Sequence, residues 1–192
     1  MIWQSDLRPT VVIPDTAPLI HLAAGQALSV LTAMGRVVVP DVVAMEATYF
    51  LGKPYARDIA DWIAAGQLPG SNQGIEVAET EIGKLYAIAL EHSLPRPRNA
   101  GEIGIAAWLA DSLAHIGGPA LVVYENGRVP GMLSREGVAA VVAVATTRNL
   151  LTMAQDRGII ADAEEVWRGI IAAIPTANPV SNLTIIHPVE AP

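Results

Sequence analysis

The hydrophobic positions of the chain fall into short continuous runs that alternate with longer periodic stretches. Runs of Val, Ile and Ala without polar interruption are typical of strands buried on both faces of a parallel sheet. Stretches whose apolar residues recur every three or four positions and end at Gly or Pro are typical of helices. The predicted strands lie in residues 10–15, 36–40, 75–77, 117–127 and the first part of 137–151.

Helical patterns fill the segments between these strands. Residues 17–35 predict two short helices with a break at Gly25 and an end at Gly35. Strands and helices that alternate at this spacing predict an α/β protein, a three-layer α/β/α sandwich with a mainly parallel central sheet. The other predicted helices occupy 41–50, 54–66, 78–93, 99–115, the second part of 137–151 and 162–174, before a proline-punctuated tail.

Length and hydropathy limit the class of protein. A chain of 192 residues fits one domain, so we expect a single domain over 1–192, with its core at about 10–150 and a C-terminal strand and helix extension. Apolar residues make up 52% of the chain, but no uninterrupted apolar run reaches the roughly 18 residues of a membrane-spanning helix. The first ten residues show no secretory signal pattern, and we expect a cytoplasmic protein without membrane contact.

Cysteine content and charge narrow the possible chemistry. The chain has no cysteine, which excludes disulfides and thiolate sites and leaves oxygen or imidazole to bind any metal. A formal charge of −7 disfavours a broadly basic nucleic-acid surface, but it allows a local basic rim around an acidic centre. Ten of the twelve basic residues are Arg, the side chain that binds phosphate in bidentate fashion.

Four acidic residues follow the predicted elements at positions where a parallel sheet gathers its ligands. Asp15 and Glu125 end two of the strands, Glu46 lies in the second turn of the helix after the second strand, and Glu102 lies in the first turn of helix 99–115. The carboxyl ends of parallel strands share one edge, so we expect the four side chains to converge there. Clustered carboxylates repel one another unless a divalent cation lies among them, and oxygen ligands select Mg²⁺ or Mn²⁺.

Each acid also has a structural interpretation of its own. Glu102 and Asn99 have the spacing of a capping box, and Asp15 can cap the short helix that follows it. Glu46 fits a partly exposed helix position, and Glu125 precedes an Asn-Gly pair that favours tight turns. The conjunction of the four acids, rather than any one of them, favours the metal site.

Four segments carry a family resemblance: VVIPDTAPLIHLA, VVVPDVVAMEA, RNAGEIGIAAWLA and ALVVYENGR. In order and spacing they resemble the signature segments of the PIN-domain family, particularly its VapC-like branch, over about residues 10–150. The resemblance implies a three-layer α/β/α fold and a Mg²⁺- or Mn²⁺-dependent endoribonuclease that cleaves single strands. Such a phosphodiester hydrolase is often the toxin of a type II toxin–antitoxin pair.

The resemblance also implies roles for individual residues. Asp15, Glu46 and Glu102 match the family's acidic positions, and Thr16 matches a small hydroxyl that helps to bind the metal or its water. The fourth segment departs from the family pattern, because Tyr-Glu-Asn-Gly stands at 124–127 where the family usually has Asp.

We assign the fourth role to Glu125, with Asn126 as a neutral oxygen ligand. Asp15 and Glu102 are expected to bind the metal directly, while Glu46 and Glu125 complete the shell or orient the attacking water. The sequence leaves open which carboxylate is the general base.

An RNA substrate requires cations around an acidic pocket. Arg96 and Arg98 precede Glu102, and Arg128 follows Glu125, so these three Arg residues are the expected phosphate contacts. The resemblance implies that single-stranded RNA or a structured RNA loop and a helical antitoxin in an apolar groove are partners, and the large apolar fraction predicts a homodimer. The Trp residues at 62, 108 and 167 fit core or interface positions, and the four His residues, which lack ligand spacing, fit structural or surface positions.

Two other functions are compatible with the pattern. The altered fourth segment allows a catalytically impaired PIN-fold protein that acts in binding or as a scaffold. A flavodoxin-like response regulator also gathers acids around Mg²⁺ at strand ends. The sequence disfavours the regulator, because no Lys follows a late strand at the required place and no adjacent acid pair follows the first strand.

Overall fold

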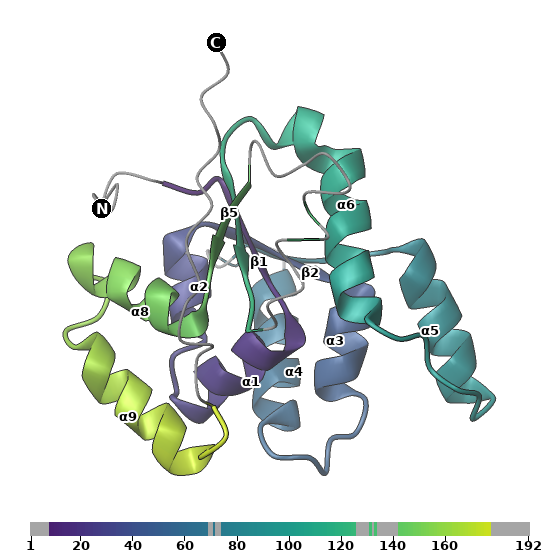
Figure 1. Ribbon diagram of the computed structural model, residues 1–192, viewed down its shortest axis with the longest axis horizontal. Coiled ribbons are helices and arrows are strands. Elements are labelled where there is room, and N and C mark those ends of the chain that lie inside the picture. Colours follow the sequence, from purple (N-terminus) through teal and green to yellow (C-terminus); the bar gives the residue numbers. More distant parts are fainter. Residues whose placement is uncertain are drawn as a thin grey trace.

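The computed structural model describes residues 8–68, 71, 74–125, 131, 133 and 142–177, and these residues fold around one five-stranded sheet. All strand pairs are parallel, so the five carboxyl ends lie at one edge, which is the lower edge in Figure 1. The spatial order is β3-β2-β1-β4-β5. The strands are β1 (Val11–Pro14), β2 (Arg36–Pro40), β3 (Ile75–Ala78), β4 (Ala120–Val123) and β5 (Val142–Ala145).

The strand sequences explain the burial of the sheet. Every residue of β1, β4 and β5 is buried, and these strands consist of Val, Ile, Leu and Ala, apart from the proline that ends β1. Pro14 and Pro40 are the last residues of β1 and β2. Proline has no N–H to donate to a ladder, so it suits the end of a strand, where the chain turns into a helix.

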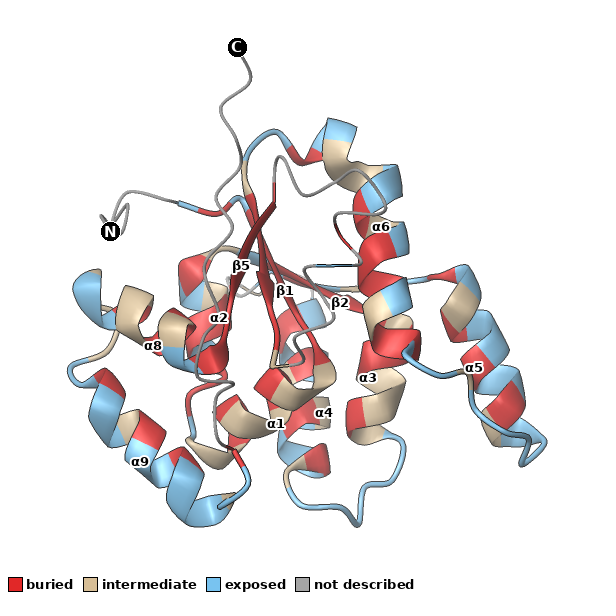
Figure 2. Ribbon diagram, in the orientation of Figure 1, coloured by how far each residue is buried: buried red, intermediate tan, exposed pale blue. Residues whose placement is uncertain are grey.

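Helices cover both faces of the sheet and complete the three-layer α/β/α sandwich that the sequence predicts. On one face α2 packs on β1 and β2 and also contacts α8, while α3 and α6 pack on the opposite face with α5 outside them. Figure 2 shows the strands buried and the helices exposed on their outer sides. The helices are α1 (Thr16–Ala24), α2 (Ser29–Met34), α3 (Asp41–Thr48), α4 (Ala56–Gln67), α5 (Glu81–Glu91), α6 (Ala100–Ile116), α8 (Thr147–Asp156) and α9 (Ala163–Ala173).

The strand order creates a topological switch point beside β1. From β1 the chain builds outward through β2 to β3, and it then returns to the other side of β1 to build β4 and β5. Open parallel sheets bind ligands in the crevice beyond the carboxyl ends of the two strands where the order reverses. In this fold the order reverses between β1 and β4, so the rule places a ligand beyond the ends of these two strands.

Each predicted strand and helix is present in the described residues, and the differences lie at helix ends. The helix predicted at 41–50 ends at Thr48. The helix predicted at 78–93 begins only at Glu81, because the hydroxyl of Thr80 accepts a hydrogen bond from the N–H of Gly83 and caps the helix. The tail beyond residue 177 lies outside the described residues.

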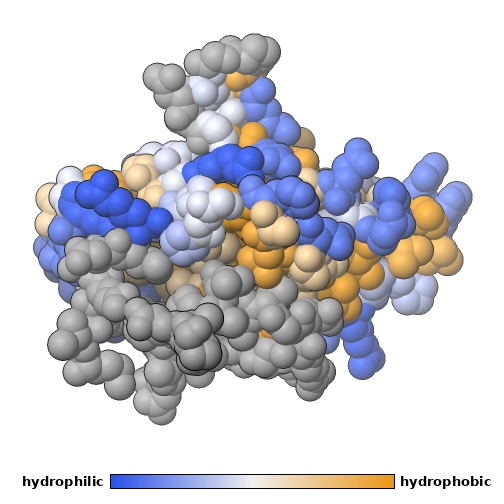
Figure 3. All heavy atoms as spheres, turned by 90° about the horizontal axis from the view of Figure 1, so that it is seen from above, coloured by the Kyte–Doolittle hydropathy of each residue, from blue (hydrophilic) through white to orange (hydrophobic). Residues whose placement is uncertain are grey.

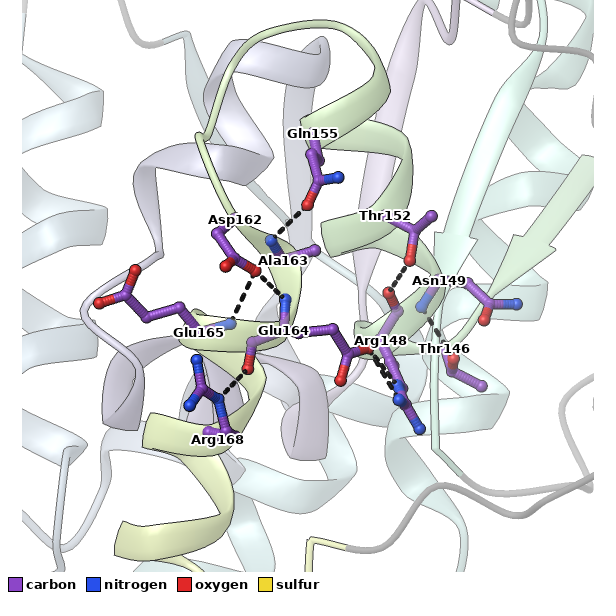
Figure 4. A network of polar contacts seen from close by, with 10 residues as sticks. All are labelled: Thr146, Arg148, Asn149, Thr152, Gln155, Asp162, Ala163, Glu164, Glu165 and Arg168. Carbon is purple, nitrogen blue, oxygen red and sulfur yellow. Dashed lines mark hydrogen bonds and ion pairs between the residues drawn. The ribbon is translucent and has the colours of Figure 1, made fainter.

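The C-terminal helices α8 and α9 are joined by a polar network on their outer surface (Figure 4). Arg148 donates to Glu164 Oε1 from Nε at 3.1 Å and from Nη2 at 2.7 Å. Asp162 caps α9 by accepting hydrogen bonds from the backbone N–H groups of Glu164 and Glu165. The carbonyl oxygen of the Gln155 side chain accepts from the N–H of Ala163, which joins the end of α8 to the start of α9.

None of the helices in the described part of the chain combines the length and the apolar character required to span a membrane.

Candidate active site

Asp15 is the residue through which β1 reaches the switch-point crevice. It follows Pro14, and its N–H donates to the carbonyl of Val123 at 2.8 Å, which fixes it against the end of β4. Its carboxylate Oδ1 accepts the N–H of Thr16 at 2.8 Å, so Asp15 caps α1 as well as pointing to the sheet edge. Only 7% of its surface is exposed. The capping interpretation is confirmed, and it is compatible with a second role.

Thr16 connects the first acid to the second. Its hydroxyl donates to Glu46 Oε2 at 2.7 Å, while its N–H donates to Asp15. Glu46 lies in the second turn of α3, as predicted. Because one threonine donates to both carboxylates, two acids that are far apart in the chain are held side by side.

The start of α6 closes on the same two acids. A Cβ atom added at Gly101 would lie 3.0 Å from Asp15 Oδ1 and 3.1 Å from Glu46 Oε2, so the helix approaches them with backbone where a side chain would crowd them. The backbone of Gly101 also forms a hydrogen bond to Glu46. Figure 1 shows the first turns of α1, α3 and α6 gathered below the strand ends. The positive end of the α6 dipole therefore faces a pair of carboxylates.

The electrostatics of the pocket reflect this gathering of acids. Burial raises the pKa of Asp15 to about 7, against the opposing hydrogen bond from Thr16, and the charges of Glu102, Glu46 and Glu125 add to the increase. Burial also raises the pKa of Glu46, which Glu102 raises further. The charges of the other three predicted acids therefore act on Asp15, and that of Glu102 acts on Glu46 as well.

Glu125 belongs to the β4 side of the crevice. Its Oε1 accepts the N–H of Thr147 at 3.0 Å, which ties β4 to the first turn of α8. The same oxygen lies 3.4 Å from His21 Nδ1, whose ring meets Trp167 of α9 edge to face with centroids 6.3 Å apart. The neighbouring Tyr124 is buried, and its pKa is raised to about 12 by burial and by the charge of Glu125.

The predicted phosphate contacts are placed only in part. Arg96 and Arg98 are exposed in the loop before α6. The charge of Arg96 lowers the pKa of Glu46, although burial of that carboxyl raises its pKa by more. Arg96 also donates a hydrogen bond from Nη1 to the hydroxyl of Tyr86 at 3.4 Å. The predicted ligand Asn126 and the predicted phosphate contact Arg128 lie outside the described residues.

The oxygen donors of this site suit a hard cation, although the described side chains are not arranged around one. Within the described ranges, no group of three or more His, Asp or Glu side chains is arranged to hold a metal ion. The carboxylates of Asp15, Glu46 and Glu125 instead accept hydrogen bonds from Thr16 and Thr147. All candidate ligands are oxygens, and neither Asp15 nor Glu46 forms a salt bridge with Lys or Arg among the residues described. Carboxylates of this kind fit Mg²⁺ or Mn²⁺ by their chemistry.

Sequence reasoning missed or misjudged three features of this site. The capping-box interpretation was wrong for Asn99, which adopts a left-handed conformation with φ 55° and makes no side-chain cap hydrogen bond. The contact between His21 and Glu125 was missed, because it joins α1 to the end of β4 and no spacing rule connects those positions. Gly101 was missed as a packing position, although a glycine directly before a candidate ligand indicates a close approach.

The Trp prediction is confirmed for burial. Trp167 is 2% exposed, and Trp62 and Trp108 are partly buried against the core. None of the three is available as an open stacking surface. A comparison with protein-family models, with curated proteins and with solved structures gives no match to this chain, so the resemblance seen in its motifs stays a prediction.

Proposed function

We propose that the protein is a Mg²⁺- or Mn²⁺-dependent endoribonuclease that hydrolyses phosphodiester bonds in single-stranded RNA. The observation that carries the proposal is that Thr16 and the start of α6 hold Asp15 and Glu46 side by side at the switch point between β1 and β4. The charges of Glu102 and Glu125 also act on Asp15. Gathering four acids in a partly buried pocket is unfavourable without a cation, so a site that does so is a candidate functional site. The motif resemblance supports the same chemistry.

In this proposal Asp15 and Glu102 would hold the cation directly, with Glu46 and Glu125 beside them. A divalent cation bound there would neutralise phosphate charge and lower the pKa of a bound water. The chain's own contribution is to keep the carboxylates in place: Thr16 fixes two of them, and the backbone at Gly101 brings α6 against both.

Protein groups also account for substrate orientation and proton transfer. Arg96 lies close enough to influence Glu46 and is exposed, so it can bind a phosphate oxygen at the rim of the pocket. Arg98 lies in the same loop and extends this rim. The pKa of Asp15 is raised to about 7, so a cation held by its carboxylate would displace a proton near neutral pH.

The motif resemblance extends the proposal to the cellular role of the protein and its partners. On that basis we propose that the enzyme is the toxin of a type II toxin–antitoxin pair, that it forms a homodimer, and that an antitoxin helix inhibits it. A catalytically impaired binding protein is the competing function, because the fourth segment lacks the family's Asp.

The test is RNA cleavage by the purified full-length chain with Mn²⁺. We expect Asp15→Asn and Glu102→Gln each to lower the rate by more than the roughly 10–100-fold that loss of an outer-shell partner costs at a metal site. Glu164→Gln is the matched control, because Glu164 is exposed on α9 and pairs with Arg148.

Two measurements separate the proposed enzyme from its alternatives. Cleavage that survives Asp15→Asn would refute the site assignment. The impaired binding form would give a different result. Mn²⁺ would raise the melting temperature of the wild type and of the Glu164→Gln control but not that of Glu102→Gln, and neither the wild type nor any variant would cleave RNA.

A further inference from the structure

Three consecutive large hydrophobic residues are exposed in the turn after α3. Tyr49, Phe50 and Leu51 are 50%, 48% and 50% exposed, while every Trp in the described part of the chain is at least partly buried. Figure 2 shows this turn, between α3 and α4, as exposed at the bottom of the view. Two aromatic rings that are open to solvent make poor use of apolar area for folding, so they are candidates for binding.

The aromatic pair has a defined geometry. The rings of Tyr49 and Phe50 meet edge to face at 87°, with centroids 4.8 Å apart. The ammonium of Lys53 lies 5.3 Å from the centroid of Phe50, within cation–π distance. A backbone hydrogen bond from the N–H of Lys53 to the carbonyl of Phe50, at 2.9 Å, closes the turn. The rings are therefore held in position by local contacts and are not buried by them.

Helix geometry places this pair beside the candidate active site. Tyr49 keeps helical dihedral angles, φ −54° and ψ −40°, and its N–H donates to the carbonyl of Met45. It therefore continues α3, three residues after Glu46. Side chains three apart lie on neighbouring positions of one helix face, about 5 Å apart along the axis.

The charge around the pair also favours an anionic ligand. Residues 49–57 contain Lys53 and Arg57, and the acids Asp58 and Asp61 come only after them, in α4, in a chain whose formal charge is −7. Both cations are exposed. A local cationic segment next to open aromatic rings is the combination used to bind single-stranded nucleic acids, where bases stack on rings and cations meet phosphates.

Other exposed apolar residues lack this combination. On the side where α5 lies, Figure 3 shows hydrophobic residues interspersed with hydrophilic ones. The large hydrophobic residues exposed on α5 are Leu85 and Ile88, which are aliphatic. Aliphatic side chains offer apolar area but no π-face, so they serve as a comparison surface.

We propose that Tyr49, Phe50 and Lys53 form a stacking platform for a base of single-stranded RNA, next to the phosphate that would lie at the acids. The inference rests on the proposed function for the identity of the pocket. It adds a binding subsite that acts through the base and does not depend on the cation.

The test measures RNA binding by the full-length chain in EDTA, where no cleavage takes place. The probe is a short fluorescein-labelled single-stranded oligonucleotide, followed by anisotropy. Because stacking of one base on an aromatic ring strengthens binding about 5- to 150-fold, we expect a double variant, Tyr49→Leu with Phe50→Leu, to bind at least about 5-fold more weakly. Leu85→Ala is the matched control and is expected to bind like the wild type.

A second readout reports stacking itself. An oligonucleotide with one 2-aminopurine loses fluorescence when that base stacks on an aromatic ring, so we expect quenching by the wild type and by Leu85→Ala, and none by the leucine double variant. Circular dichroism of each variant checks that the fold is retained.

The outcomes separate this inference from the proposed function. Wild-type affinity in the double variant, or no RNA binding by the wild type in EDTA, would overturn the platform whether or not RNA is cleaved with Mn²⁺. Unchanged RNA affinity together with loss of dimerisation in the double variant would assign the rings to protein contact and also overturn it. Loss of RNA affinity in the double variant without any Mn²⁺-dependent cleavage would support the platform and refute the nuclease.

Discussion

The acidic pocket and the α8–α9 hairpin use the same residue types in opposite ways. In the hairpin, the exposed carboxylates of Asp162 and Glu164 each meet a donor, either backbone N–H groups or the Arg148 guanidinium (Figure 4). In the pocket, Asp15 is buried and feels the charges of three other carboxylates.

The difference separates a structural role from a functional one. Exposed and paired acids stabilise helix ends by small amounts. Buried acids that repel one another destabilise the fold, and natural sequences retain such conflicts mainly at functional sites. The rest of the fold must therefore offset the stability that this repulsion removes. The free energy of unfolding measures that loss.

The largest expected effect is on the pH dependence of the free energy of unfolding, which Asp15 is expected to dominate. Burial raises its pKa from 3.8 to about 7. Between those values the folded state keeps a proton that the unfolded chain has lost, so this group lowers the free energy of unfolding as pH rises from about 4 to 7. At 1.36 kcal/mol per pKa unit, the loss approaches about 4 kcal/mol above that range.

Asp15→Asn removes the titrating carboxyl group. The amide oxygen of the substituted side chain can still accept a hydrogen bond from the N–H of Thr16. In EDTA, we expect denaturant unfolding to show the variant to be the more stable protein at about pH 8, with a gap that narrows towards about pH 5. Mn²⁺ is expected to stabilise the wild type only. A variant that is less stable than the wild type at every pH would mean that the pocket is an ordinary part of the fold.

A smaller effect is expected at the start of α9. Asp162→Ala removes the oxygen that accepts from the N–H groups of Glu164 and Glu165, and loss of an N-cap costs about 1 kcal/mol. Thermal or urea unfolding measures this change. The rate of RNA cleavage, at a temperature where the variant is folded, should match that of the wild type. A lower rate would show that the α8–α9 hairpin also affects the acidic site.

The smallest effect is expected for Arg148→Met. The Arg148–Glu164 pair is about half exposed on both sides, and exposed pairs contribute about 0.2–1 kcal/mol. Raising the salt concentration should reduce the difference in unfolding free energy between the wild type and the variant, because exposed charges are screened. A salt-independent difference larger than about 2 kcal/mol would show that the hairpin depends on this pair more than its exposure indicates.

The fold was predictable because its signals are local. The run at 36–40 is apolar after its first residue and gives β2, and the spacing of apolar residues in 54–66 gives α4. The order of the strands in the sheet is not local information, since β1 pairs with β4 across most of the chain. The parallel arrangement followed from the alternation of strands and helices, whereas the order β3-β2-β1-β4-β5 did not.

The candidate site was predictable to the extent that its residues follow strands. Asp15 and Glu46 were found because they come soon after buried runs that end in proline. His21 and the turn at Tyr49 and Phe50 were missed, because their roles depend on which side of a helix faces which neighbour. The sequence shows that YFL is apolar, and only the structure shows that it is exposed.

The central place of β1 has a consequence for biosynthesis. Its Val11 pairs with Ala120, so during translation the first strand leaves the ribosome long before the strand that covers its second edge. Pairings between such remote segments form slowly, and an uncovered strand edge invites association with other chains. Asp15 also docks on Val123 only once β4 is in place. A nascent chain therefore cannot bring Asp15 and the end of β4 together until synthesis is well advanced.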